Sequence, residues 1–229
     1  AWNIHRLKKQ EEPNAETKSI ILIEGRDHPL LRPCVQNLKE QLPDWPIHLV
    51  GTSENEHTLR DLDVDDVTIL NYKLTLDKFN NLLVSPHFWQ DIVKTDRVLL
   101  TQTDAWICHN PIFPIDDFLV YDYVGAPWYT GQGHDKLELV GNCGLALCNS
   151  STMLHIIEKH PPHKNKEPID VYFSKHITNK PSAIVAKAFS VENTWFPQPV
   201  GVHKPFEMDG QILKKLEKHC RGVSILQQY

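Results

Sequence analysis

The sequence lacks the signatures of several common protein classes. No apolar run approaches the roughly 18 residues that a membrane-spanning helix needs. The 5 cysteines are an odd number without a C-x-x-C pair, which argues against a disulfide framework and a zinc ribbon and favours buried or ordinary free thiols. Aspartate and glutamate (29) outnumber lysine and arginine (24), and the net charge of -5 argues against a nucleic-acid partner.

Several catalytic motifs are absent as well. The chain has no G-x-x-x-x-G-K-[ST] phosphate loop, no G-x-G-x-x-G after its first predicted strand, and no H-E-x-x-H metal motif. It also has no G-x-S-x-G nucleophile elbow. These absences argue against P-loop and dinucleotide chemistry, zinc proteolysis and serine hydrolysis.

The segments that are present predict an α/β fold. A chain of 229 residues can bury a sheet covered by helices in one domain. Continuous apolar runs are typical of buried strands, and apolar residues at helical spacing fill the stretches between them. The expected strands are residues 19–23, 46–51, 67–70 and 97–101, and the expected helices are residues 29–42, 74–84 and 85–93. This alternation favours a mainly parallel sheet with helices on both faces.

The second half of the chain has a less regular pattern. Glycines interrupt the apolar runs that predict strands, and a glycine-rich stretch at 129–135 predicts a loop. The expected strands are 121–126, 137–148 and 187–191, and the expected helices are 150–159, 168–177 and 209–220. The polar residues 1–18 predict a flexible arm before a single domain at 19–229. Because residue 1 is Ala, an anchor could have been removed upstream, so the chain could act in the cytoplasm or in the secretory-pathway lumen.

Asp104 is the strongest single candidate for a functional side chain. It follows the predicted strand at 97–101, and open α/β sheets bind ligands at the carboxyl ends of their strands. A carboxylate there can hold a divalent cation, which in turn neutralises a diphosphate. The alternative, which the position favours by itself, is a turn-forming or helix-capping aspartate.

Two glycine-containing segments are candidates for ligand contact. One strand ends in Gly-Ala-Pro before Trp128, whose ring can serve as a platform for a sugar or a base. In the other segment Gly141 and Gly144 flank Asn142, and such a backbone can turn N–H groups toward a ligand. The alternatives, which each pattern favours by itself, are a strand turning a corner over a buried tryptophan and a β-bulge.

Three polar residues of the second half are further candidates. Asp170 lies in the first turn of a predicted helix, where a carboxylate is usually a cap but can also serve as a general base. His203 can ligate a metal ion and Lys204 can meet phosphate charge, although the chain holds 13 histidines.

Taken in order, these blocks resemble an incompletely characterised family of GT-A-like proteins, whose members resemble nucleotide-diphospho-sugar transferases. The resemblance rests on Q-T-D (102–104), D-Y-V-G-A-P-W (122–128) and G-N-x-G-L-A-L (141–147), and it covers roughly residues 19–206. It implies a GT-A (Rossmann-like) α/β domain with a mixed, mainly parallel sheet.

The resemblance also implies a role for each candidate. Asp104 and His203 would hold a divalent metal ion, Mn²⁺ in preference to Mg²⁺, and Asp170 would be the base of an inverting reaction. The donor nucleotide and its diphosphate would contact Glu24, Arg26, Thr52, Gln102, Thr103, Asp104 and Lys204. The acceptor would contact Trp128, Gly141, Asn142 and Gly144.

The function implied is transfer of a hexose from a UDP- or GDP-sugar to a glycan, protein or small-molecule acceptor. Two positions depart from the family pattern: Gln102 replaces the first aspartate of D-x-D, and Ile169 replaces a glutamate before Asp170. The first departure keeps open a non-catalytic module that binds a nucleotide-sugar or glycan. A sugar-phosphate nucleotidyltransferase is less favoured, because the loop after the first strand has a single glycine, Gly25.

Overall fold

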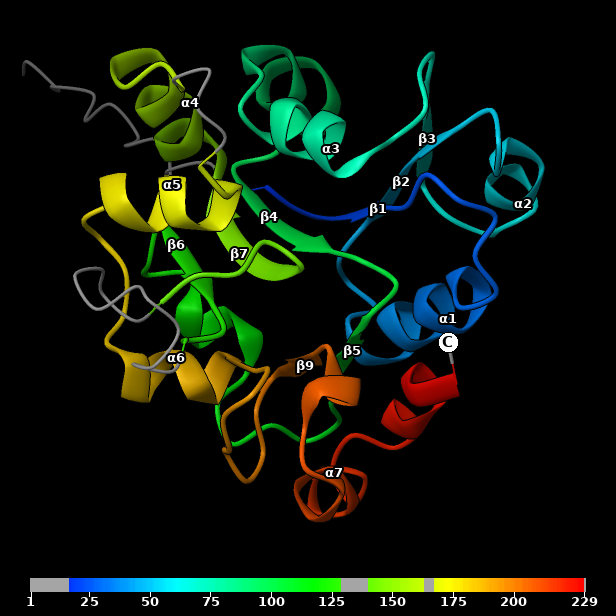
Figure 1. Ribbon diagram of the computed structural model, residues 1–229, viewed down its shortest axis with the longest axis vertical. Coiled ribbons are helices and arrows are strands. Elements are labelled where there is room, and N and C mark those ends of the chain that lie inside the picture. Colours follow the sequence, from blue (N-terminus) through cyan, green and yellow to red (C-terminus); the bar gives the residue numbers. More distant parts are fainter. Residues whose placement is uncertain (1–16, 129–139, 163–166, 229) are drawn as a thin grey trace, which may run out of the picture.

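A mixed six-stranded sheet forms the centre of the computed structural model, which describes residues 17–128, 140–162 and 167–228 (Figure 1). Its strand order is β3-β2-β1-β4-β7-β6. β3, β2, β1 and β4 are parallel neighbours, whereas β7 runs antiparallel to both β4 and β6. The strands are β1 (Lys18–Ile23), β2 (Ile47–Thr52), β3 (Asp66–Leu70), β4 (Arg97–Thr101), β6 (Tyr123–Gly125) and β7 (Leu145–Asn149). This is the predicted α/β architecture.

The aliphatic runs place β1 and β4 in the middle of the sheet. Ile20 lies between Ile47 of β2 and Leu99 of β4, and all three side chains are buried. Strands covered on both faces need apolar side chains at every position, which is why these segments are continuous rather than alternating.

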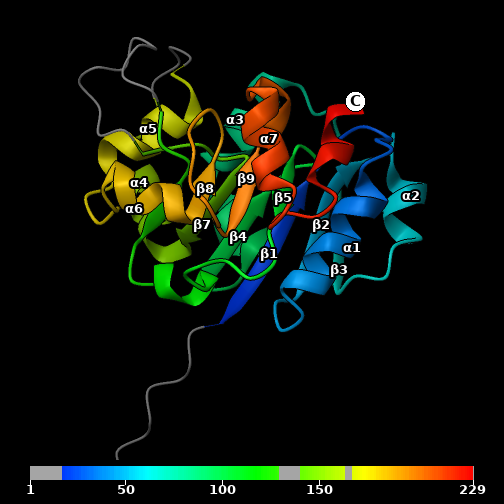
Figure 2. The same ribbon diagram turned by 90° about the horizontal axis from the view of Figure 1, so that it is seen from below.

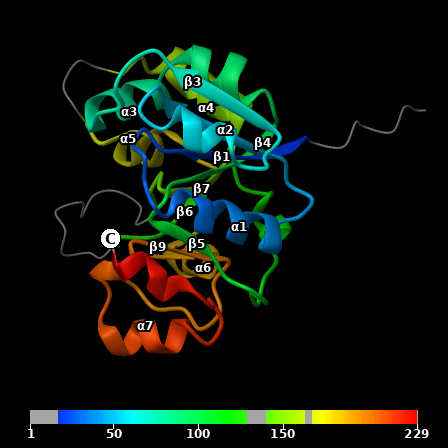
Figure 3. The same cartoon turned by 90° about the vertical axis from the view of Figure 1, so that its right-hand side faces the viewer.

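Helices cover both faces of the sheet (Figure 3). On one face, α1 contributes Leu31, Val35 and Leu38 at helical spacing to a core shared with η2, α6 and α7. On the other face, α3, η1, α4 and α5 pack around residues such as Phe88 and Phe173. The helices are α1 (Leu31–Gln41), α2 (Glu56–Arg60), α3 (Leu76–Leu83), the π-helix η1 (Phe88–Val93), η2 (Ile115–Phe118), α4 (Ser150–Lys159), α5 (Ile169–His176), α6 (Ala183–Phe189), η3 (Pro205–Glu207), α7 (Gly210–Leu216) and η4 (Val223–Gln228). Among these described helices, none has the length and apolar character required to span a bilayer.

A second, three-stranded sheet joins distant parts of the sequence (Figure 2). It consists of β5 (Ala105–Ile107), β9 (Gly201–His203) and β8 (Ser190–Val191) in that order. β5 begins directly after Asp104, and its first residue, Ala105, pairs with His203 of β9. This register brings Asp104 and His203 to the same end of the small sheet.

Several expectations need correction. The strand predicted at 187–191 is wrong for its first three residues, because α6 continues to Phe189 and β8 is only Ser190–Val191. Lys18, predicted as part of the arm, already pairs with Arg97 in the sheet. Residues 1–16 of the arm, the expected loop at 129–135 and the first part of the strand predicted at 137–148 lie outside the described residues.

The cysteine expectation is wrong for one pair. Cys108 and Cys220 form a disulfide across a sequence separation of 112 residues, although the cysteine pattern argued against one. Cys34, Cys143 and Cys148 are free and buried, as predicted. An odd cysteine count excludes complete pairing but says nothing about one pair that the fold brings together.

Candidate active site

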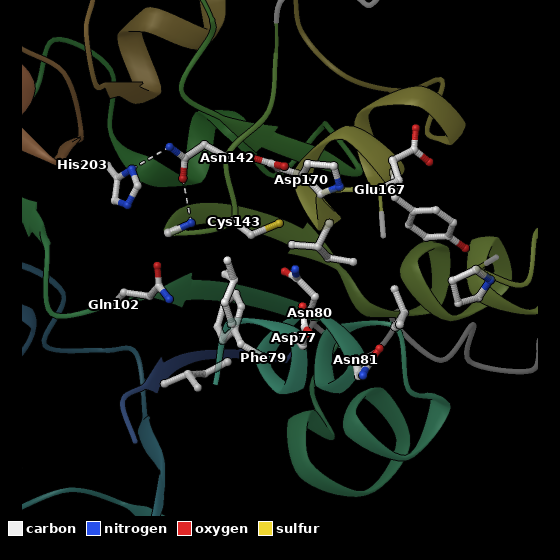
Figure 4. Close-up of a pocket in the computed structure, with 18 of the residues that line it drawn as sticks. Asp77, Phe79, Asn80, Asn81, Gln102, Asn142, Cys143, Glu167, Asp170 and His203 are labelled. Atoms are coloured by element: carbon white, nitrogen blue, oxygen red, sulfur yellow. Dashed lines mark hydrogen bonds between the residues drawn. The ribbon is translucent and has the colours of Figure 1, made fainter. Parts of the chain in front are cut away.

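A cleft of about 2010 Å³ runs along the carboxyl ends of β1 and β4 (Figure 4). Its lining includes residues that follow these strands, the segment before β7, one side of α3, the start of α5 and the end of β9. Figure 4 shows Gln102 and His203 at one end, with Asp170 and residues of α3 on opposite sides farther along. The cleft is therefore at the sheet edge where α/β folds bind ligands.

Asp104 and His203 meet beside this cleft. His203 Nε2 lies 3.3 Å from Asp104 Oδ1, so the two side chains that the family resemblance assigns to one metal ion are neighbours. Both atoms are buried, and neither has a hydrogen-bond partner within the described part of the chain. The two atoms pair as imidazolium and carboxylate when His203 is protonated, whereas only a neutral imidazole could share a cation with Asp104.

The other side of the imidazole is held by buried polar groups. Asn142 Nδ2 lies 2.6 Å from His203 Nδ1 and donates to Glu192 Oε2 at 2.7 Å, and Glu192 Oε1 lies 3.4 Å from the same ring nitrogen. Burial opposes a charge on His203, but the carboxylates of Asp104 and Glu192 raise its pKa to about 9. The ring is therefore set between two anionic groups.

Glycine residues make this close packing possible. A Cβ on Gly144 would lie 2.0 Å from His203 Nε2, and one on Gly141 would lie 2.1 Å from the Trp128 ring. Such distances exclude any larger residue without a shift of the ring. Trp128 is 9% exposed and packs over Gly141, so the buried alternative for this residue is largely correct, although one side still lines the cleft.

Glu24 organises the part of the cleft rim next to Thr103. Its carboxylate accepts bonds from Arg26 Nε and Nη2 at 2.8 Å each, from the Arg26 backbone N–H at 3.0 Å, and from Thr103 Oγ1 at 2.7 Å. Burial alone would raise the pKa of Glu24, but these bonds hold it below its ordinary value. The carboxylate of Glu24 is therefore fully bonded to neighbouring residues, whereas the Arg26 side chain is 65% exposed at the cleft.

The Asp104–His203 pair fits a divalent cation. Two ligand atoms about 2.1 Å from one ion and at right angles lie about 3 Å apart, which is close to the observed separation. Across the described residues, no group of three or more His, Cys, Asp or Glu side chains is arranged to hold a metal ion. A cation would thus have two protein ligands here and complete its shell with water and phosphate oxygens, as Mg²⁺-type sites commonly do.

Asp170 is a second carboxylate of the cleft. It lies in the first turn of α5, and its Oδ1 accepts the Val171 backbone N–H at 2.9 Å. Burial raises its pKa, and the nearby charge of Glu192 adds to the effect. A carboxylate with a raised pKa in a cleft has the character of a proton acceptor.

The structure separates the expected site residues into two groups. Lining the cleft are Glu24, Arg26, Gln102, Trp128, Asn142, Gly144, Asp170, His203 and Lys204. Outside the lining are Thr52, Thr103, Asp104 and Gly141. Thr52 is buried and donates to the Gly25 carbonyl at 2.7 Å, so it supports the β1 loop rather than contacting a ligand. The Asp104 side chain, which is 31% exposed, lies beside His203.

The structure gives Asn142 a positioning role and adds Glu192 to the site. The Asn142 Nδ2 group is hydrogen-bonded to Glu192 and His203, and its Oδ1 accepts the Gly144 N–H at 2.7 Å. These bonds position His203, and the expected contact of Asn142 with an acceptor stays a prediction. Glu192 was not expected, because a lone carboxylate after a two-residue strand leaves no pattern in the sequence.

Two solved glycosyltransferase structures are similar to this chain. The apo-form glycosyltransferase GlyE of Streptococcus pneumoniae TIGR4 matches 93% of this chain and 60% of its own, with 12% identity and a TM-score of 0.53. This likeness shows the fold of GT-A glycosyltransferases. The mannosyltransferase PcManGT of Pyrobaculum calidifontis, solved with GDP-Man and Mn²⁺, matches 69% of this chain and 50% of its own, with 13% identity and a TM-score of 0.42.

This chain spans only 60% and 50% of the length of those two proteins. None of the curated proteins compared with the chain matches it. A family model does match residues 67–203, which include Asp104, Asn142, Asp170 and His203. With more than half of its residues matched, the chain belongs to the family described as "Protein of unknown function (DUF5672)".

Proposed function

We propose that this chain transfers a hexosyl group from a UDP- or GDP-sugar to an acceptor hydroxyl. The observation that carries the proposal is the 3.3 Å approach of Asp104 Oδ1 and His203 Nε2, both buried, beside the cleft at the carboxyl ends of the strands. The GT-A fold agrees with this chemistry, but fold alone does not assign an activity.

Two cationic side chains are suited to the donor diphosphate. Arg26 is fixed by Glu24, and the remaining N–H groups of its planar fork suit phosphate oxygens. Lys204 also lines the cleft, and its Nζ is 3.7 Å from Glu192 Oε1. Both would favour the charge that develops on the leaving diphosphate.

Asp170 is the proposed acceptor of the hydroxyl proton. In an inverting transfer the acceptor oxygen forms a bond to the anomeric carbon, while the bond from that carbon to the diphosphate oxygen breaks. The bonding electron pair leaves with the diphosphate, and the hydroxyl proton passes to Asp170. In a retaining transfer, Asp170 would instead hold the acceptor hydroxyl.

Asp104 and His203 are the proposed metal ligands. A bound Mn²⁺, or Mg²⁺, would supply electrostatic stabilisation of the diphosphate leaving group. Asn142 and Glu192 keep the imidazole in place, which is the usual arrangement behind a metal-binding histidine.

The test is donor turnover by Asp104→Asn, which removes the charge and keeps the shape. We expect hydrolysis and transfer with UDP- and GDP-sugars plus Mn²⁺ to fall about 100-fold or more, because the lost group acts on the developing charge. Asp63→Asn, at a carboxylate with 95% exposure, is the matched control and should retain full activity. Wild-type rates in Asp104→Asn would rule out its proposed role.

One observation favours a second function, a non-catalytic module that binds nucleotide sugars. Gln102 lines the cleft where the family pattern has a carboxylate, so the site carries one negative charge fewer toward a metal ion. This module predicts donor binding in calorimetry with no release of nucleotide diphosphate over long incubation. Measurable release by the wild type, lost in Asp104→Asn, would exclude it.

A further inference from the structure

The cleft is larger than a donor site requires. Small-molecule pockets usually have volumes of about 300–1,000 Å³, whereas this cleft measures about 2010 Å³. Gln102 and His203 mark its donor end, and the lining continues past Asp170 to α3, the end of α4 and α5 (Figure 4). We call the part of the cleft beyond Asp170 its distal half. This half has room for a second ligand that is larger than one small molecule.

One wall of this distal half is α3. The helix is capped by Thr75, whose Oγ1 accepts the Lys78 N–H at 3.3 Å, and Leu82 and Leu83 are buried in the core. This packing fixes the rotation of the helix, so Phe79, Asn80 and Asn81 line the cleft, on the side opposite Asp170 (Figure 4).

The α3 wall combines one aromatic ring with two carboxamides. Each carboxamide can donate to and accept from a hydroxyl group, and an aromatic face suits the C–H face of a sugar ring. The lysine of this helix, Lys78, lies 5.5 Å from the Tyr72 ring and is not part of the lining. This wall thus offers hydroxyl-binding groups without a cation.

The opposite wall offers a rigid aromatic surface. The rings of His160 and His176 are stacked with centroids 4.3 Å apart, and Tyr172 meets His176 edge-on at 5.1 Å. Tyr172 Oη donates to the His160 carbonyl at 2.7 Å, which locks the group. Burial and the neighbouring His160 and Lys175 lower the pKa of His176, which favours the neutral form of this ring.

The distal charges are balanced rather than of one sign. Lys175 lies 3.6 Å from Glu167, and the two other charged lining residues of this half, Asp77 and Lys159, have opposite signs. A polyanionic acceptor would need a cationic excess. A peptide that binds by strand addition would need a strand edge for its backbone, but the walls described here are helical.

We infer that the acceptor is a neutral oligosaccharide of at least two sugar units, bound between Asn80 and Asn81 of α3 and the His160–His176 stack. Its reactive hydroxyl lies toward Asp170 and the donor end. The transfer itself rests on the proposed function, whereas recognition of the glycan does not.

The test measures glycan binding apart from turnover. The full chain is mixed, without donor, with neutral mono-, di- and tetrasaccharides of glucose, galactose, mannose and N-acetylglucosamine, with a sulfated oligosaccharide, and with a Ser/Thr peptide. Binding is followed by saturation-transfer NMR and calorimetry. We expect a neutral oligosaccharide to bind more tightly than its monosaccharide. Asn80→Ala/Asn81→Ala should weaken this binding about tenfold, since it removes two or more hydrogen bonds.

Lys78→Ala is the matched control, because it alters the same helix away from the cleft. It should bind the oligosaccharide as the wild type does, and both variants should keep the wild-type affinity for the nucleotide sugar. The inference is overturned if no neutral oligosaccharide binds, if the sulfated glycan or the peptide binds instead, or if the double variant binds unchanged. Glycan binding without donor turnover would refute only the proposed function, and turnover onto the peptide would refute only the inference.

Discussion

Gly144 sets how closely the backbone approaches the imidazole of His203. A Cβ at this position would lie 2.0 Å from Nε2, the ring atom that faces Asp104. We expect Gly144→Ala to displace the ring and weaken donor binding with Mn²⁺ by about tenfold or more, since misplacement of about 1 Å in a site can cost 100-fold in rate. Calorimetry with UDP- and GDP-sugars measures the effect.

Gly210 provides the control for this substitution. It is the first residue of α7, and a Cβ there meets nothing within 4 Å. Gly210→Ala should therefore bind the donor normally and keep or raise the thermal midpoint. Wild-type donor affinity in Gly144→Ala would show that the position of His203 is not critical for the donor.

Glu24, at the rim of the cleft, should make the free energy of unfolding depend on pH. Its bonds with Arg26 and Thr103 hold its pKa below the ordinary value despite burial. A lowered folded-state pKa gives stability that is present above the unfolded pKa and is lost as pH falls through the folded one. We expect Glu24→Gln to lower the free energy of unfolding at pH 7 by about 1–3 kcal/mol, and this difference to shrink toward pH 3.

Denaturant titrations at a series of pH values measure that difference. Glu40→Gln is the control, because Glu40 is an exposed residue that accepts one bond from Gln36. It should change stability by less than about 0.5 kcal/mol at every pH. A Glu24→Gln effect that is constant from pH 7 to pH 3 would contradict the proposed linkage.

For single residues, the sequence could identify candidates for the site but not the side chains that they contact. Only the family resemblance implied that Asp104 and His203 converge. No spacing rule could have done so, because 99 positions separate the two residues. Their neighbour Glu192 was missed for the same reason. The bonds by which Asn142 positions His203 depend on side-chain geometry, which a sequence does not carry.

Among the elements, those with strong periodicity were predicted well. β4 and α4 have the predicted bounds, and β1, β2 and β3 differ by one residue at one or both ends. Their long apolar runs or helical spacing are dictated by burial and leave a clear pattern. The sheet was therefore predictable in its parallel half.

The small sheet was not predictable in this way. Its strands contain two or three residues, too few for an alternating pattern, and they depend on pairing over long sequence separations. The same shortness explains the error at α6, whose last residues were assigned to the following strand. Because this sheet carries His203 and adjoins Asp104, the least predictable element is the one that builds the site.

Over the whole molecule, one covalent link ties the site to the C-terminal region. Cys108 directly follows β5, and Cys220 lies between α7 and η4. The link therefore fastens the C-terminal helices against the small sheet that holds Asp104 and His203. Both cysteines are buried, so local opening must precede reduction.

Removal of this disulfide should destabilise the entire fold. It closes a loop across 112 residues, and loops of about 100 residues correspond to at most about 4–5 kcal/mol in the chain-entropy model. We expect Cys108→Ala/Cys220→Ala to lose about 3–5 kcal/mol and roughly 10 °C in thermal midpoint by calorimetry. Cys148→Ala controls for the loss of a buried sulfur without a crosslink and should cost much less. Equal losses in the two variants would mean that packing, not the crosslink, accounts for the stabilisation.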